Sequence, residues 1–338
     1  MTQTATPDAT ELDPRAASAR QWALQELKLE AAADLQFAPA SADASFRRYF
    51  RIVQGAQSWV VMDAPPDREN LGPFIEIAGL SIDAGLNAPR VLAEDRARGF
   101  LLLTDLGRQT FLHVLDAQNA DALMQDAIAA LIRWQLASRP GVLPPYDAAL
   151  LQRELDLFPE WYVGRHLGRT LTAAQREALT GIEQQLIASA LAQPSVYVHR
   201  DYMPRNLMVS TPSPGVLDFQ DAVYGPISYD VVSLFRDAFL SWPAERVEHW
   251  MQSYWQQARA AGLPVHADFA AFRRAADWMG LQRHLKVIGI FARICHRDGK
   301  PHYLADVPRF IVYVRDVGAR YPELAPLLTL FDELGLQA

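Results

Sequence analysis

The sequence predicts an α+β protein of two lobes, a small β-rich lobe at the N-terminus and a larger, mainly helical lobe at the C-terminus. The chain has 338 residues, of which 50% are hydrophobic, so it can bury more core than one domain usually holds. Short β-rich runs gather before residue 105, and amphipathic helical patterns fill most of the remainder. We expect an N-lobe over residues 1–103 and a C-lobe over residues 104–338.

Composition excludes several classes of protein. Cys295 is the single cysteine, so no internal disulfide can form, and the start MTQTATPDATELDPR lacks the apolar core of a signal peptide. No window approaches the roughly 18 apolar residues of a membrane span. A net charge of −7 without a basic run argues against nucleic acid. We therefore expect a cytoplasmic protein with a small-molecule partner, no membrane and no obligate protein partner.

The N-lobe elements follow from local patterns. Pro14 opens a helical pattern whose apolar residues share one face, and Gly55 lies between two runs of β-forming residues. In chain order we expect a disordered start, a packing helix, a β-hairpin, a second helix and two strands: residues 1–13, the helix from Pro14, strands 45–53 and 59–64, helix 70–84, strands 89–92 and 100–105.

One compact β insert interrupts the helical C-lobe, and it holds the motif His-Arg-Asp. The insert reads VYVHRDYMPRNLMV and then GVLDFQD. Asp201 is followed by Asn206 in the pattern H-R-D-x-x-x-x-N, and Asp218 comes 17 residues after Asp201. Short strands at 207–209 and 215–217 can form a hairpin that brings Asn206 beside Asp218.

These residue types suit phosphoryl transfer. An amide oxygen and a carboxylate are two oxygen ligands for one hard divalent cation, here Mg²⁺ at Asn206 and Asp218. Asp201, just before the first strand, is a carboxylate near the metal that can accept a proton. Kinases use this set of a catalytic-loop Asp, a metal-binding Asn and a metal-binding Asp that opens a D-F-x turn.

A second His-Arg-Asp occurs at residues 296–298, in the text CHRDGKPHY. Tyr303, not Asn, stands five residues after Asp298, and no pair of strands follows. Gly299 and Pro301 are typical of a turn that ends a helix. We therefore interpret the second copy as surface structure without a chemical role.

Three stretches carry a family resemblance: HRDYMPRN, VLDFQDAVYGPISYDVVSLFRDAF and DASFRRYFRI. They resemble the aminoglycoside phosphotransferase-like branch of the protein-kinase fold. More narrowly, together with MDAPP at 62–66, they are similar to the bacterial anomeric kinases of N-acetylmuramate and N-acetylglucosamine. The resemblance covers nearly the whole chain after residue 14, and the segment 199–239 is its most specific part.

The resemblance implies a two-lobed protein-kinase-like fold and an activity. ATP would be clamped between the lobes, with its adenine against Thr104, Asp105 and Leu106. Asp201 would orient the acceptor hydroxyl or accept its proton, while Asn206 and Asp218 would hold Mg²⁺. The product would be a sugar 1-phosphate that feeds cell-wall sugar recycling.

The sequence departs from the kinase pattern in two places. The segment SADASFRRYF has no glycine where kinases have a glycine-rich loop, so Ser45 and nearby backbone N–H groups would take over the phosphate contact. No lysine lies between Lys28 and Lys286, so the strand lysine of kinases is missing. A hairpin arginine is our candidate replacement, because guanidinium binds phosphate oxygens bidentately. Arg48 is the first choice, ahead of Arg47 and Arg51.

Other residues near the motif have structural interpretations. We expect His199 to be packed and to fix the loop rather than act as a base, Arg200 to contact an acidic group, and Asp230 to brace or cap the loop. The candidates for substrate contact are Arg205, Asp221, Arg236, Arg283 and Lys286.

Arg283 and Lys286 lie three residues apart in a helical pattern over 281–294, so they share one face. Two interpretations stay open for this pair. The two residues are either solvated surface charges or a contact for the lactyl carboxylate that distinguishes N-acetylmuramate from N-acetylglucosamine.

Three alternative functions stay open. An aminoglycoside kinase, or a kinase of another small-molecule hydroxyl, would share the motifs, but basic residues on the helices of the C-lobe favour a neutral or anionic acceptor. A protein kinase fits less well, because Gln220 replaces the Gly of D-F-G and no A-P-E follows. A nucleotide-binding pseudokinase scaffold would explain the missing lysine but not the intact Asp201, Asn206 and Asp218.

Overall fold

The computed structural model describes most of the chain, residues 13–30, 34–41 and 46–337. The expected disorder of residues 1–13 concerns residues outside this described part, apart from Asp13. The chain divides into two compact units, of which the first comprises Met1–Ile82 with Asn87–Arg108 and the second Asp83–Leu86 with Gln109–Ala338. A small antiparallel sheet in the first unit and a mainly helical second unit confirm the predicted fold class.

The first unit is built on a five-stranded antiparallel sheet in the order β1-β2-β3-β5-β4. The predicted hairpin, the two helices and the strand from Phe100 are confirmed, and the strand predicted at 89–92 is present but shifted, because β4 begins at Val91 and ends at Asp95. In chain order the elements of this unit are α1 (Pro14–Leu27), β1 (Gln36–Ser41), β2 (Arg48–Gln54), β3 (Gln57–Asp63), α2 (Leu71–Asp83), β4 (Val91–Asp95) and β5 (Phe100–Thr104).

Strand β1 was not expected from the sequence. It contains Pro39, which cannot donate a ladder hydrogen bond and therefore argues against a strand. The structure places β1 at the edge of the sheet, where β2 is its partner among the described strands and the register shifts between Pro39 and Ser41. An edge position tolerates the missing donor.

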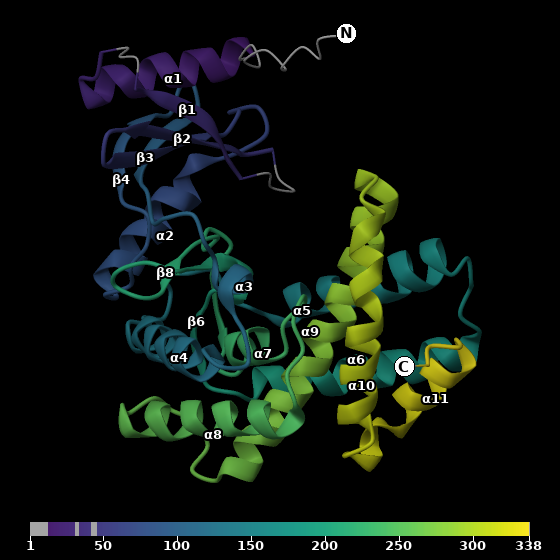
Figure 1. Cartoon of the computed structure of the whole chain (residues 1–338). Helices are drawn as coiled ribbons and strands as arrows, with labels where there is room; N and C mark the ends of the chain where they lie inside the picture. Colours follow the sequence, from purple (N-terminus) through teal and green to yellow (C-terminus); the bar gives the residue numbers. More distant parts are fainter. Residues whose placement is uncertain (1–12, 31–33, 42–45, 338) are drawn as a thin grey trace, which may run out of the picture. The chain divides into compact units, whose positions relative to one another are not determined.

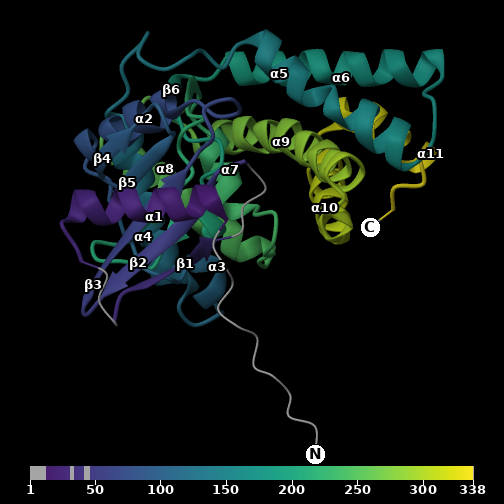
Figure 2. The same cartoon turned by 90° about the horizontal axis from the view of Figure 1, so that it is seen from above.

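Helix α1 covers one face of this sheet (Figures 1 and 2). The Asp13 carboxylate accepts hydrogen bonds from the N–H groups of Arg15 and Ala16, both at 3.0 Å, and Pro14 follows it in the first turn. Trp22 lies 5.7 Å from the ring of Phe100, centroid to centroid. The helix packs with apolar side chains from one face of the strands: Phe50, Ile52, Val61, Phe100 and Leu102.

The second unit holds a helical core and two short β-ladders. In chain order its elements are α3 (Phe111–Val114), α4 (Ala120–Leu136), α5 (Ala148–Leu155), η1 (Phe158–His166), α6 (Ala173–Leu191), β6 (Ser195–Val198), η2 (Pro204–Asn206), β7 (Leu207–Met208), β8 (Gly215–Val216), β9 (Val223–Pro226), α7 (Tyr229–Phe235), α8 (Ala244–Ala260), α9 (Phe269–Asp298), η3 (Pro301–Asp306), α10 (Val307–Gly318), η4 (Pro322–Leu324) and α11 (Ala325–Glu333).

Helix α9 is the central element of this unit, and α6, α7, α10 and η1 pack against it (Figure 1). Its middle turns are buried, charged positions included. Gly289 allows the chain before η1 to approach closely, since a Cβ there would lie 2.3 Å from the carbonyl carbon of Leu157. Across the described residues, no helix combines the length and apolar character that crossing a membrane requires.

Candidate active site

Two antiparallel ladders frame the motif loop of the second unit. Strand β6 pairs with β9, and β7 pairs with β8. The β7–β8 hairpin was predicted from the sequence, whereas the β6–β9 ladder was not. The loop 199–206 leaves β6 and leads through η2 into β7, so its ends are fixed by both ladders.

The hairpin brings the three motif residues together. The Asn206 Nδ2 donates hydrogen bonds to the backbone oxygen of Asp201 at 2.9 Å and to Asp218 Oδ2 at 3.3 Å. The N–H of Leu217 donates to the Asn206 carbonyl at 2.9 Å, which extends the ladder toward Asp218. Asp218 has φ +64°, and its Oδ1 accepts from Gln220 Nε2 at 2.8 Å. The juxtaposition expected from the spacing is therefore present.

The Asp201 carboxylate is part-exposed, and within the described part of the chain no hydrogen bond or ion pair engages it. Its backbone N–H lies 3.3 Å from His199 Nδ1. The loop thus holds the backbone of Asp201 on both sides and leaves its carboxylate oxygens without a hydrogen-bond partner among the described residues.

His199 and Asp230 brace this loop from beneath, as the sequence predicts. Asp230 is fully buried, and its carboxylate accepts from the N–H of His199 at 2.7 Å and of Arg200 at 3.0 Å. Burial raises the pKa of Asp230 to about 7, against the lowering effect of these two N–H groups. Burial lowers the pKa of His199 to about 4, so its ring is neutral at pH 7. His199 is therefore a packed residue in the loop.

The three hairpin arginines of the first unit have different partners. Arg48 lies on the α1 side of the sheet, opposite Asp63 on β3, and its guanidinium bonds the carboxylates of Asp63, at 2.6 Å, and Asp13. The opposite face carries Arg51, which bonds Asp105 at 2.6 Å and the carbonyl of Gly107. Arg48, our first choice for phosphate, is thus held by two carboxylates beside α1.

Arg47 differs from both, because it lies before β2 and pairs with a residue near α2. Its guanidinium bonds Glu69 at 3.1 Å, and both side chains are half-buried. Ser45, the predicted backbone contact for phosphate, lies outside the described residues.

The predicted adenine segment has its polar side chains engaged inside the first unit. Asp105 accepts from Arg51 and from the N–H of Gly107 at 3.0 Å, and Thr104 Oγ1 accepts from the N–H of Arg90 at 2.9 Å. Burial raises the pKa of Asp105. Its hydrogen-bond donors, Arg51 foremost, lower the pKa by a larger amount, so the net shift is downward. Leu106 is half-buried.

Arg283 and Lys286 are not solvated surface charges, and that interpretation is wrong. Their exposures are 2% and 7%. Lys286 Nζ bonds Glu154 at 2.8 Å and the hydroxyl of Tyr229 at 2.9 Å, whereas Arg283 Nη1 donates to the carbonyl of Arg236 at 3.4 Å. A lysine closed between a carboxylate and a phenol has little freedom to bind a substrate anion.

The other substrate candidates are also placed. Arg236 bonds the buried Asp277 at 3.1 Å, so its charge is compensated inside the unit. The Arg205 guanidinium lies 5.1 Å from the ring centre of Phe239, and Asp221 is exposed. None of these contacts tests a role in binding substrate, which stays a prediction.

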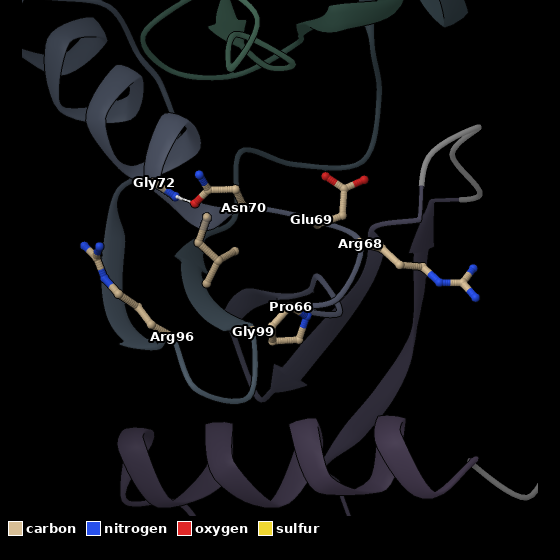
Figure 3. A pocket seen from close by; sticks show the side chains of 8 residues that line it. Pro66, Arg68, Glu69, Asn70, Gly72, Arg96 and Gly99 are labelled. Carbon is tan, nitrogen blue, oxygen red and sulfur yellow. Dashed lines mark hydrogen bonds between the residues drawn. The ribbon is translucent and has the colours of Figure 1, made fainter.

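A hollow in the first unit is lined by residues between β3 and α2 and by the turn between β4 and β5. Figure 3 shows it beside the start of α2, where Asn70 Oδ1 accepts from the N–H of Gly72 at 2.8 Å. Arg68 and Arg96 extend from it in opposite directions, and they lie near Asp67, at 3.6 Å, and Glu94, at 3.2 Å. Glu69 also lines the hollow, is half-buried, and pairs with Arg47 across 22 positions of sequence.

Comparison with known proteins gives the class. The model of the phosphotransferase enzyme family matches residues 36–272, and the chain belongs to this family. A protein named N-acetylmuramate/N-acetylglucosamine kinase from Pseudomonas putida is 62% identical over 295 residues, 87% of each chain. A protein of the same name from Neisseria meningitidis serogroup B is 51% identical over 316 residues, 92% of this chain and 93% of the other. The resemblance drawn from the sequence is confirmed.

Solved structures confirm the fold. The gentamicin complex of the aminoglycoside phosphotransferase APH(2″)-IIa matches with a TM-score of 0.59 at 16% identity, over 90% of this chain and 97% of that one. Choline kinase LicA from Streptococcus pneumoniae matches with a TM-score of 0.58 at 13% identity, over 89% and 100%. These neighbours share the architecture at low identity, so they show the fold alone.

Proposed function

We propose that this chain is a cytoplasmic, ATP-dependent kinase that phosphorylates the anomeric hydroxyl of N-acetylmuramate and N-acetylglucosamine, in cell-wall sugar recycling. The observation that carries the proposal is the cluster of Asp201, Asn206 and Asp218, held together by Asn206 Nδ2. The names of relatives at 51–62% identity support the two sugars as acceptors.

Each residue of the cluster has a proposed role. Asp201 orients the acceptor hydroxyl and accepts its proton, because its carboxylate is part-exposed and without a partner in the described part of the chain. An anomeric hydroxyl is more acidic than an ordinary alcohol, which lowers the barrier to this transfer. Asp230 and His199 keep the Asp201 backbone in place, so the chain contributes mainly positioning.

The donor set of the cluster fits Mg²⁺. Asn206 Nδ2 donates to the Asp201 carbonyl and to Asp218 Oδ2, so the ligands that this cluster would offer are the amide oxygen of Asn206 and the remaining lone pairs of the Asp218 carboxylate. Oxygen ligands of this kind are those that hard divalent cations take. When bound with ATP, the cation would supply neutralisation of phosphate charge.

We propose Arg47, in place of Arg48, as the arginine that contacts ATP phosphate. Kinases orient the phosphate-binding lysine with a glutamate, and Arg47 with Glu69 is the hairpin pair of this kind. Arg48 is occupied by Asp13 and Asp63 beside α1. Arg47→Ala should raise the KM for ATP about tenfold or more, the scale of a lost charge-assisted contact, with the KM for sugar unchanged. Arg48→Ala is the matched control, and a larger ATP effect there would reverse the assignment.

A substrate panel tests the activity itself. Purified chain with MgATP should add one phosphate to both sugars, detected by mass, and the product should lose its reducing end. The methyl glycoside of N-acetylglucosamine, which has no anomeric hydroxyl, is the control. Phosphorylation of the methyl glycoside would refute the anomeric position, and turnover of an aminoglycoside alone would leave the family and remove the sugar assignment.

A further inference from the structure

A buried carboxylate lies at the centre of a polar cluster behind the motif loop. Glu154, near the end of α5, is 5% exposed. It accepts hydrogen bonds from Arg200 Nη2 at 2.5 Å, Lys286 Nζ at 2.8 Å and Gln282 Nε2 at 3.0 Å, and from the hydroxyl of Tyr146. These donors come from the loop after β6, from α9 and from the segment before α5.

The cluster is ionised. Burial raises the pKa of Glu154, but the nearby charges of Lys286 and Arg200 outweigh burial and lower the pKa to about 2. For Lys286, burial lowers the pKa, and nearby Tyr229 and Glu154 raise it to give a net upward shift. Removing Glu154 from this set would leave two cations without their shared anion, which is strongly destabilising. Every member therefore constrains where the others lie.

Arg200 is the member that reaches the catalytic residue, because it directly precedes Asp201. Its φ of +77° lies in the left-handed region, which is strained for a residue with a Cβ. Its N–H is held by Asp230, and its guanidinium is held by Glu154. Backbone and side chain are thus fixed from two different elements, α7 and α5.

We propose that Glu154 and Lys286 form a positioning device that locks Arg200 and thereby sets the direction of the Asp201 carboxylate. Kinases that depend on an activation segment order their sites when a phosphate added to that segment pairs with arginine. Here α5 supplies the anion permanently, so the loop is preorganised without a modification. The inference rests on the proposed kinase activity and assigns Lys286 a structural partner instead of the substrate.

Two variants distinguish a positioning role of Glu154 and Lys286 from a role in stability alone. Arg200→Gly removes the guanidinium and relieves the positive φ, and Glu154→Gln/Lys286→Met removes one negative and one positive charge together. Arg200→Gly leaves Glu154 paired with Lys286 and should keep the melting temperature within a few degrees. The double variant leaves the Arg200 guanidinium without its carboxylate and should melt several degrees lower, so its kcat is measured well below that melting temperature. Each should lower kcat about 10–100-fold, the scale of a misplaced catalytic group, with the KM for ATP and for sugar within about threefold. Arg200→Lys, which can still reach Glu154, should retain more activity than Arg200→Gly.

Arg297→Gly, the same change in the exposed second copy of the motif, is the matched control. The rate of ATP hydrolysis without sugar is also measured for each variant and for the wild type. This comparison does not depend on which sugar is the acceptor. Full kcat in Arg200→Gly, or equal loss of kcat and affinity in both variants, would overturn the positioning role. A wild type without ATP turnover on any acceptor would overturn the proposed kinase activity and this inference together.

Discussion

The tripeptide His-Arg-Asp occurs twice, at residues 199–201 and 296–298, in opposite surroundings. The first copy follows β6, with Arg200 at φ +77°, whereas the second is the last turn of α9, ended by Gly299 at φ +68°. His199 is 2% exposed, and His296 is exposed. The same three residues therefore adopt two backbone conformations. Only the conformation of the first copy holds the aspartate in a loop with a fixed direction.

The arginines show the same difference. Arg200 bonds a glutamate 46 positions away in sequence, inside the unit. Arg297 bonds its own neighbour Asp298 at 2.6 Å, and its side chain is 56% exposed. An exposed pair contributes little to stability, while a buried one constrains its surroundings. The role of a motif therefore depends more on the residues that contact it than on its own amino-acid sequence.

Changing the aspartate of each copy should give the largest contrast. Asp201→Asn removes the proposed proton acceptor and should lower kcat by about 10² or more, with nucleotide binding and the fold retained. Asp298→Asn should leave kcat at the wild-type level. Steady-state kinetics with circular dichroism on both variants measures this. Near wild-type turnover in Asp201→Asn would remove that residue from the mechanism.

Replacing Asp218, the proposed metal ligand near the first copy, should change nucleotide binding in a different way. Asp218→Ala should weaken nucleotide binding about 10–100-fold with Mg²⁺ present and change it little with EDTA, since the lost contact is to the cation. Calorimetric titration of a non-hydrolysable ATP analogue under both conditions reports the difference. Equal affinities in variant and wild type with Mg²⁺ would refute the metal assignment.

The histidines should differ in their effect on acid stability. The folded-state pKa of His199 is about 4, below the ordinary 6.5, so between these values the unfolded chain binds more protons. Stability contributed by neutral His199 is present above pH 6.5 and is lost as the pH falls toward 4, roughly 2 kcal/mol of it by pH 5. His199→Gln should therefore lose less stability than wild type between pH 7 and pH 5 in urea unfolding. His296→Gln is the control. If the free energy of unfolding fell equally with pH in the wild type and in both variants, the expectation would be contradicted.

The smallest effect is expected at the second copy. Arg297→Ala should change the free energy of unfolding by no more than about 0.5 kcal/mol, because an exposed pair between sequence neighbours is screened by water. Thermal melting at low and at high salt measures it. A loss of several kcal/mol would show that the second copy has a structural role that its exposure does not indicate.

The sequence alone determined the features that local spacing controls. The hairpin β7–β8, the juxtaposition of Asn206 and Asp218, and the bracing by Asp230 were all predicted. Periodicity, turn residues and the restricted reach of a short hairpin suffice for such contacts. The family followed from the same segment, because the motif residues occur there at fixed intervals.

Only the tertiary structure decided which charged side chains are buried and what they face. Lys286 and Glu154 lie on α9 and α5, far apart in sequence, and nothing in the local pattern of either helix marks them as partners. Arg48 likewise depends on Asp13 and on Asp63 across the hairpin, beside α1. Folding removes water from charges on distant segments, and this cost is offset where opposite charges come together. The local sequence pattern does not show which distant charges will pair.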